Sequence, residues 1–273
     1  MRVGQIGQSG CYGKFPRLGD FVTRSLPGPL VEIWDEWLQD GISASRDALG
    51  DTWVEEYVVS PVWCFALGRG SLEQTTWLGV LIPSVDRVGR YFPFTVMVNA
   101  GDCAPLAAMH RWQDWYGAAQ ELALDSLDDD FDPETLIERL DALPGDSEPA
   151  LLPRPTVESM TPLAQASRHY GLGESVSTSD VLAGIATDAL SEILPACSVW
   201  WTQGSERLPA SLLVAEGMPS ATGFSALLNG AFDAEGWSHG GTIGSDQPAS
   251  PPDTYLDPDP TVEDLDLDTN PGI

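Results

Sequence analysis

The chain has 273 residues, 42% of them hydrophobic, and its 41 acidic and 13 basic residues give a formal net charge of −28. This length fits one large domain or two small ones, and ten tryptophans provide for a substantial core. Nucleic acid is excluded as a partner class, because phosphate contacts need a basic surface. No apolar run reaches the ~18 residues of a membrane span, and the first residues lack an apolar signal segment. We therefore expect a cytoplasmic protein with no membrane insertion.

The acidity has two expected sources. Residues 253–270 hold seven acids and no base, which leaves a net charge of −21 on the rest of the chain. From their glycine, proline and aspartate content we predict that residues 231–273 form a disordered acidic tail. A salt-adapted proteome is the expected origin of the remaining charge.

The first elements are two short strands and a helix. We predict a strand near residues 11–15, a turn at 16–20 and a second extended piece after it. Pro27 and Pro29 then fix the entry to a helix that runs to about residue 49, where a glycine is placed as the C-cap. Its apolar stripe follows helical spacing and comprises Leu30, Ile33, Trp34, Trp37, Leu38, Gly41, Ala44 and Ala48.

Three strand-like runs follow, at residues 62–67, 77–82 and 91–98. The second is almost continuously apolar, which is typical of a strand buried on both faces. Their connections of 9 and 8 residues are too short for helical crossovers, so we expect antiparallel neighbours. A further helix is predicted over residues 105–124, with Leu106, Met109, Gln113, Tyr116, Ala119 and Ala123 on one stripe. The fold class is therefore α/β of the α+β type: a mainly antiparallel sheet with helices packed on it, in a longin- or profilin-like order.

The second half of the chain is divided by a long connection. Asp132 and Pro133 are placed as N-cap and first residue of a helix to about residue 143, which ends an N-terminal domain of residues 1–143. Residues 144–178 are predicted to be an exposed, partly disordered connection. Residues 179–230 are predicted to form an αββα part that packs on the same domain. Its elements are a helix over 181–194, strands at 198–202 and 210–215, and a helix over 220–228.

The motif search finds no catalytic, cofactor or metal site. Gly10, Gly13 and Lys14 lack the spacing of a phosphate-binding loop, and Phe15 replaces its magnesium-binding hydroxyl. The three histidines are isolated, so serine or cysteine catalysis has no placed base. The four cysteines are scattered, which is typical of small buried thiols rather than of disulfides or zinc ligands. We therefore expect a protein that is not an enzyme.

Five of the thirteen bases concentrate in two loops marked by glycine and proline: Lys14, Arg17, Arg24, Arg87 and Arg90. One interpretation is structural, with these bases paired to Asp20 and Asp86; the other is a partner-binding surface. We assign Lys14, Arg17 and Arg24 to partner binding. Asp20, Asp86, Arg87 and Arg90 are assigned to a structural motif. We expect the two loops to lie side by side at one end of the sheet.

Several segments, in order, carry a family resemblance. They include residues 13–22 (Gly-Lys-Phe-Pro-Arg-Leu-Gly-Asp-Phe-Val), Trp34 with Trp37, and residues 60–68 (Ser-Pro-Val-Trp-x-Phe-Ala-Leu-Gly). Further on come residues 79–93, which contain Pro-Ser-Val-Asp-Arg-Val-Gly-Arg-Tyr-Phe-Pro, and the Ser-Val-Trp-Trp-Thr at 198–202. With these segments the chain resembles the TagF family, also called ImpM, of type VI secretion-associated proteins.

The resemblance implies a function by binding. It suggests a cytoplasmic accessory protein of the contractile secretion machine that acts as a post-translational repressor of its firing, with a forkhead-associated scaffold protein as partner. It implies no catalytic residues and no cofactor. Two alternatives stay open: a longin-like adaptor for another cytoplasmic partner, and a cryptic phosphoester-binding enzyme that uses Asp20, Asp86 and the arginines.

Overall fold

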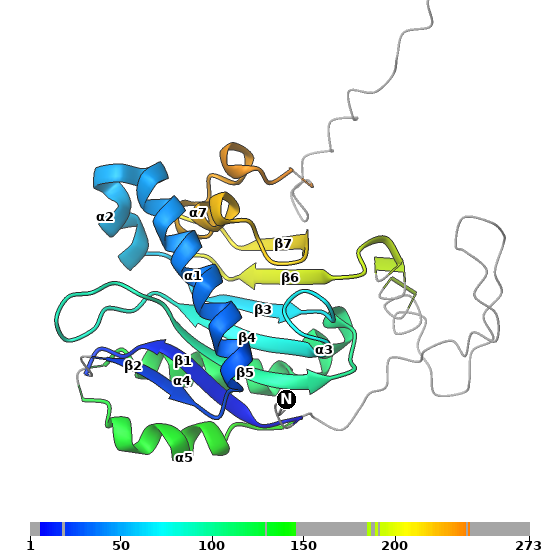
Figure 1. The fold of residues 1–273 in the computed structure, drawn as a ribbon, viewed down its shortest axis with the longest axis horizontal. Helices are drawn as coiled ribbons and strands as arrows, with labels where there is room; N and C mark the ends of the chain where they lie inside the picture. Colours follow the sequence, from blue (N-terminus) through cyan, green and yellow to red (C-terminus); the bar gives the residue numbers. More distant parts are fainter. Residues whose placement is uncertain are drawn as a thin grey trace, which may run out of the picture. The chain divides into compact units, whose positions relative to one another are not determined.

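The structure, a computed structural model, describes residues 6–17, 20–128, 130–145, 185–186, 189–190, 192–238 and 240. The chain divides into two units, Met1–Trp237 and Ser238–Ile273, and the elements below belong to the first. Its centre is a seven-stranded antiparallel sheet with the strand order β2-β1-β5-β4-β3-β6-β7 (Figure 1). The strands are β1 (Ser9–Lys14), β2 (Phe21–Arg24), β3 (Trp63–Leu67), β4 (Thr76–Ile82), β5 (Phe94–Gly101), β6 (Cys197–Thr202) and β7 (Ser211–Glu216).

This sheet confirms the predicted fold class, while the comparison with longin and profilin domains stays a prediction. Strand β4 is buried along its whole length, as its continuous apolar run predicts. Strand β5 begins three residues later than predicted, because Pro93 has no N–H to donate to the sheet. The preceding residues close a loop instead: Val85 and Tyr91 form an isolated bridge, and the N–H of Phe92 donates to the carbonyl of Ser84 at 3.1 Å.

One face of the sheet is covered by α1 (Gly28–Leu49), α2 (Trp53–Val58) and α7 (Ala221–Asn229) (Figure 1). Gly50 ends α1 with a positive φ of 52°, as its predicted C-cap role requires. Helices α1 and α7 cross closely at Gly41, where an added Cβ would lie 2.5 Å from Cγ of Phe224. The buried stripe of α1 is narrower than predicted, because Ile33 and Ala48 are exposed. It comprises Leu30, Trp34, Leu38, Gly41, Ile42 and Ser45.

The opposite face carries α3 (Pro105–Arg111), α4 (Gln113–Asp125) and, after a 3-10 turn, α5 (Leu136–Asp141). The prediction of one helix over 105–124 is wrong, since the backbone departs from helical angles at Trp112. Of the predicted stripe, Tyr116, Ala119 and Ala123 are buried, whereas Leu106 and Met109 are half-buried and Gln113 is exposed. The sheet also accommodates two indoles from positions one residue earlier, so the buried face further comprises Pro105, Ala108, Trp112, Trp115 and Leu122.

Regular structure continues past residue 231, where the disordered tail was predicted to begin. Ser220 caps α7 by accepting the N–H of Gly223 at 3.0 Å. A 3-10 helix (Phe232–Glu235) follows in the predicted tail, because Phe232 and Trp237 pack on the α1–α7 side of the sheet. The predicted connection beyond residue 145, half of the predicted helix 181–194 and the tail beyond residue 238, apart from residue 240, lie outside the described residues.

The cysteines and the helix lengths concern two further expectations from the sequence. The four cysteines are free thiols, and burial raises the pKa of Cys11 and of Cys64 to about 12. Within the described residues, no helix is both long and apolar enough to span a membrane.

Candidate functional site

A charged network closes one end of the sheet. Oδ2 of Asp86 accepts hydrogen bonds from Nζ of Lys14 at 2.8 Å and from Nε of Arg90 at 2.7 Å. Its second oxygen, Oδ1, accepts the backbone N–H groups of Val88 at 3.0 Å and of Arg90 at 2.9 Å. Both carboxylate oxygens are therefore satisfied, one by two cations and the other by the backbone of the loop.

The backbone explains why these groups meet. Strand β1 pairs with β5, with Gly13 opposite Phe94, and this register brings Lys14 beside the loop that precedes β5. Within that loop the N–H of Asp86 donates to the carbonyl of Arg90, and the N–H of Gly89 donates to the carbonyl of Asp86. Gly89 has a φ of 82°, which favours glycine at this position. The loop is thus a rigid turn wrapped around one carboxylate.

Burial makes this network electrostatically strong. The side chains of Asp86 and Lys14 are 0% and 6% exposed, whereas that of Arg90 is 55% exposed. Desolvation alone would raise the pKa of the Asp86 carboxyl, but the hydrogen bonds from Lys14, Arg90 and two backbone N–H groups outweigh it. The pKa of Asp86 therefore lies well below its usual range, and the carboxylate stays charged.

The end of β1 and the Asp86 loop lie side by side, as predicted, but Lys14 is buried and not exposed for a partner. It was predicted to face a partner, whereas the structure buries it against Asp86 because that carboxylate needs a countercharge. Asp20 also differs from the prediction. It is exposed, and its Oδ1 accepts the N–H of Phe21 at 2.8 Å rather than an arginine among the described residues.

The three remaining arginines are exposed but do not share one location. Arg17 follows β1, and Arg87 lies in the loop beside Asp86, so both belong to the same end of the sheet. Arg24 lies opposite Cys11, at the far end of β2, and its Nη1 donates to the carbonyl of Thr23. The structure thus separates Arg24 from the other two by the length of a short strand.

Two apolar residues at this end were not among the predicted site residues. Phe21 is exposed on β2, where its ring stacks on Tyr12 at 5.7 Å and lies 5.3 Å from Nζ of Lys14. Val88 is exposed at the tip of the Asp86 loop. The alternation of β2 signals an outward Phe21, but only the register of β1 and β2 places it beside Lys14. We call Arg17, Phe21, Arg87, Val88 and Arg90 the loop-end surface.

The loop-end surface has the composition of a binding region. Arginine and aromatic side chains are enriched at protein interfaces, and here a rigid turn supports them. Among the described residues, no group of three or more His, Cys, Asp and Glu side chains is placed to hold a metal ion. Fold and site together define a mixed α/β sheet protein with a buried lysine–aspartate pair, joined by a half-exposed arginine, at one end.

Comparison with known proteins assigns the family. Residues 10–143 match the model of the TagF N-terminal domain, described as type VI secretion system-associated. The chain belongs to the TagF family and is a type VI secretion system-associated protein. It is similar to the solved structure of PA0076 from Pseudomonas aeruginosa PAO1, with 34% sequence identity and a TM-score of 0.66 over 89% of this chain and 100% of that one. No match was found among curated proteins.

Proposed function

We propose that this chain is a non-enzymatic, cytoplasmic repressor of a type VI secretion system, and that it acts after translation by binding a partner at the loop-end surface. Membership of the TagF family supports the association with the secretion machine. The resemblance to that family suggests repression, and it suggests a forkhead-associated scaffold protein as the partner.

The proposal rests on a contrast in charge between the loop-end surface, which is rich in arginine, and the rest of the chain, which is acidic. Arginines gather at one end of a protein with a net charge of −28, around exposed Phe21 and Val88. The buried Lys14–Asp86 pair holds the loops in place, so that little conformational entropy is lost when a partner binds. A partner surface that carries acidic groups around an apolar depression is complementary to this arrangement.

The test is the affinity of purified variants for the purified forkhead-associated scaffold of the same secretion system. We expect Arg17→Ala and Arg87→Ala each to weaken binding at least tenfold, and the melting temperature of Arg87→Ala to stay unchanged. Arg24→Ala is the matched control: it removes the same charge from the far end of β2, and we expect binding within twofold of the wild type. Equal affinities for all three variants would refute the loop-end surface as the binding region.

A further inference from the structure

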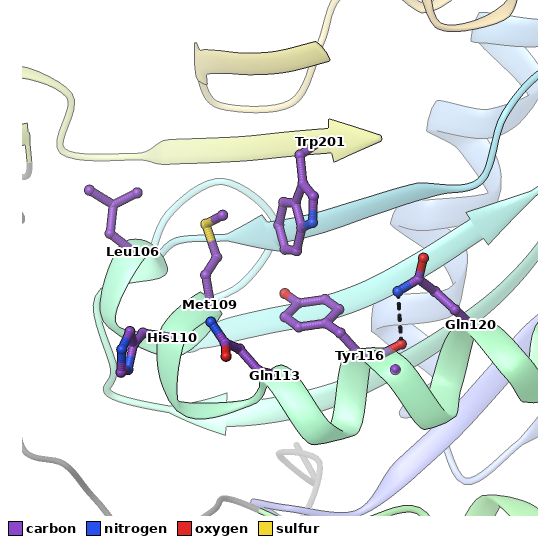
Figure 2. A pocket seen from close by; sticks show the side chains of 8 residues that line it. Leu106, Met109, His110, Gln113, Tyr116, Gln120 and Trp201 are labelled. Carbon is purple, nitrogen blue, oxygen red and sulfur yellow. Dashed lines mark hydrogen bonds between the residues drawn. The ribbon is translucent and has the colours of Figure 1, made fainter. Parts of the chain in front are cut away.

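A second surface lies far along the sheet from the loop-end network, beside β6. A hollow of about 420 Å³ opens there between helices α3 and α4 and strand β6 (Figure 2). It is lined by Leu106, Met109, His110, Gln113, Tyr116, Gly117, Gln120 and Trp201. Leu106, Met109 and Gln113 belong to the stripe that helical spacing predicts for the core. Because Trp112 and Trp115 take buried positions, these three side chains border the hollow instead.

The walls of the hollow are fixed. The Tyr116 hydroxyl donates to the carbonyl of Phe65 at 2.7 Å, and its ring meets that of Trp201 edge-on at 4.7 Å. Nε2 of Gln120 donates to the carbonyl of Tyr116 at 3.1 Å, the bond drawn in Figure 2. Gly117 has open space where a Cβ would stand, so at this one position α4 presents only backbone to the hollow.

The apolar surface continues from the hollow onto the edge of the sheet. Trp201 lies opposite Leu212 in the pairing of β6 with β7, and Val199 lies opposite Val214. Leu212 and Val214 are 60% and 40% exposed, on the side of the sheet that Trp201 shares. Strand β7 ends the strand order of the sheet, so these two side chains border a row of backbone groups that pair with no further strand in the part of the chain that the structure describes.

Charge decides what kind of partner fits this surface. Among the described residues, no Asp, Glu, Lys or Arg side chain lines the hollow. Of the described residues that border it, three are acidic and one is basic. Asp114 and Glu121 are exposed on α4 next to two lining residues, Glu216 follows Val214 on the same side of β7, and the base is Arg111, next to His110. A second copy of this chain would bring acids against acids in a protein that already carries −28. A cationic segment with apolar anchors would meet the opposite charge on both flanks.

We propose that the hollow at Trp201, together with Leu212 and Val214, is a second docking surface that binds a basic amphipathic segment of a partner protein. One large apolar side chain of that segment fills the hollow, and its neighbours cover Leu212 and Val214. Lysine or arginine side chains on both sides of the anchor pair with Asp114, Glu121 and Glu216. This surface is separate from the loop-end surface, so its test stands independently of the repressor function.

The experiment uses the full chain and three synthetic 16-residue peptides. The probe has leucines at helical spacing with one central tryptophan, and lysines at the other positions. One control peptide replaces the lysines with glutamates, and the other replaces the leucines and the tryptophan with serines. Titration calorimetry in 150 mM salt gives the affinities. We expect the probe to bind at least tenfold more tightly than either control.

Two variants of the chain locate the site. Gly117→Phe fills the hollow from a helical position with open space, so the fold accommodates it, and Trp201→Ala removes one wall. We expect each to weaken binding of the probe at least tenfold. Ile33→Ala removes an exposed apolar side chain from the opposite face and should change the affinity less than twofold.

Three outcomes would overturn the proposal. In the first, the variants bind the probe like the wild type, which would mean a non-specific attraction of lysines to an acidic chain. In the second, the wild type is a dimer in solution and Gly117→Phe makes it a monomer, so that a second copy is the occupant. In the third, the wild type does not bind the probe but a chain without residues 146–184 does, which would make that segment the cover.

Discussion

Lys14 and Asp86 are 72 positions apart in the chain, yet Nζ and Oδ2 meet at 2.8 Å with both side chains almost fully removed from water. The contact joins the end of β1 to the loop between β4 and β5. It depends on one strand register, in which Gly13 lies opposite Phe94. A single ion pair thus links the packing of the sheet to the position of the loop-end surface.

We predict that Asp86→Ala destabilises the protein by about 3–5 kcal/mol, because it leaves the buried Lys14 without its countercharge. The free energy of unfolding from urea titration measures this. Asp102→Ala is the control: its pair with Arg69 is 3.7 Å long with side chains 81% and 67% exposed, so the expected cost is below about 1 kcal/mol. Similar losses for the two variants would contradict a buried network.

The pH dependence of stability should report the same carboxylate. The pKa of Asp86 is lowered in the folded state, so its stabilisation is complete above the unfolded pKa of about 4 and is lost as the pH falls below that value. We expect the unfolding free energy of the wild type to fall more steeply below pH 4 than that of Asp86→Asn. Above pH 5 the difference between the two should be constant. Parallel curves over pH 2–6 would argue against the lowered pKa.

A pair of glycine substitutions tests the packing of the sheet. An added Cβ at Gly79 would lie 2.0 Å from Cζ of Phe65, so Gly79→Ala should cost about 1–3 kcal/mol through overpacking. Gly117 lies in α4 with open space around it, and Gly117→Ala should stabilise the helix by about 0.5–1 kcal/mol. Thermal and urea unfolding would compare them, and a stabilising Gly79→Ala would show that β4 and Phe65 pack differently.

Much of the fold could be predicted because the apolar runs of the strands are nearly continuous and the caps are local. Gly50 and Ser220 mark the ends of their helices through their own backbone needs. Helix faces were harder to predict. Over 105–124 the predicted Tyr116, Ala119 and Ala123 are buried. A stripe offset by one residue fits the 3.6-residue period equally well, and the sheet also buries Trp112 and Trp115 from it.

The candidate site could be predicted only in part. A charged residue between two core strands must find a partner, which pointed to Asp86. Which base would pair with it depends on the contact of β1 with β5, a relationship between distant segments that no local pattern encodes. Grouping Arg24 with Arg17 was misleading for the same reason, since the register of β1 and β2 places Arg24 opposite Cys11.

Repression of secretion by binding at the loop-end surface can be measured in cells. The measurement is the amount of a secreted substrate of the machine released by a strain whose chromosomal copy carries Arg17→Glu and Arg87→Glu, with the cellular level of the chain quantified alongside. Both side chains are exposed, so we expect the variant to accumulate at the wild-type level. We predict release at the level of a deletion strain, and wild-type release with normal accumulation would contradict repression through the loop-end surface.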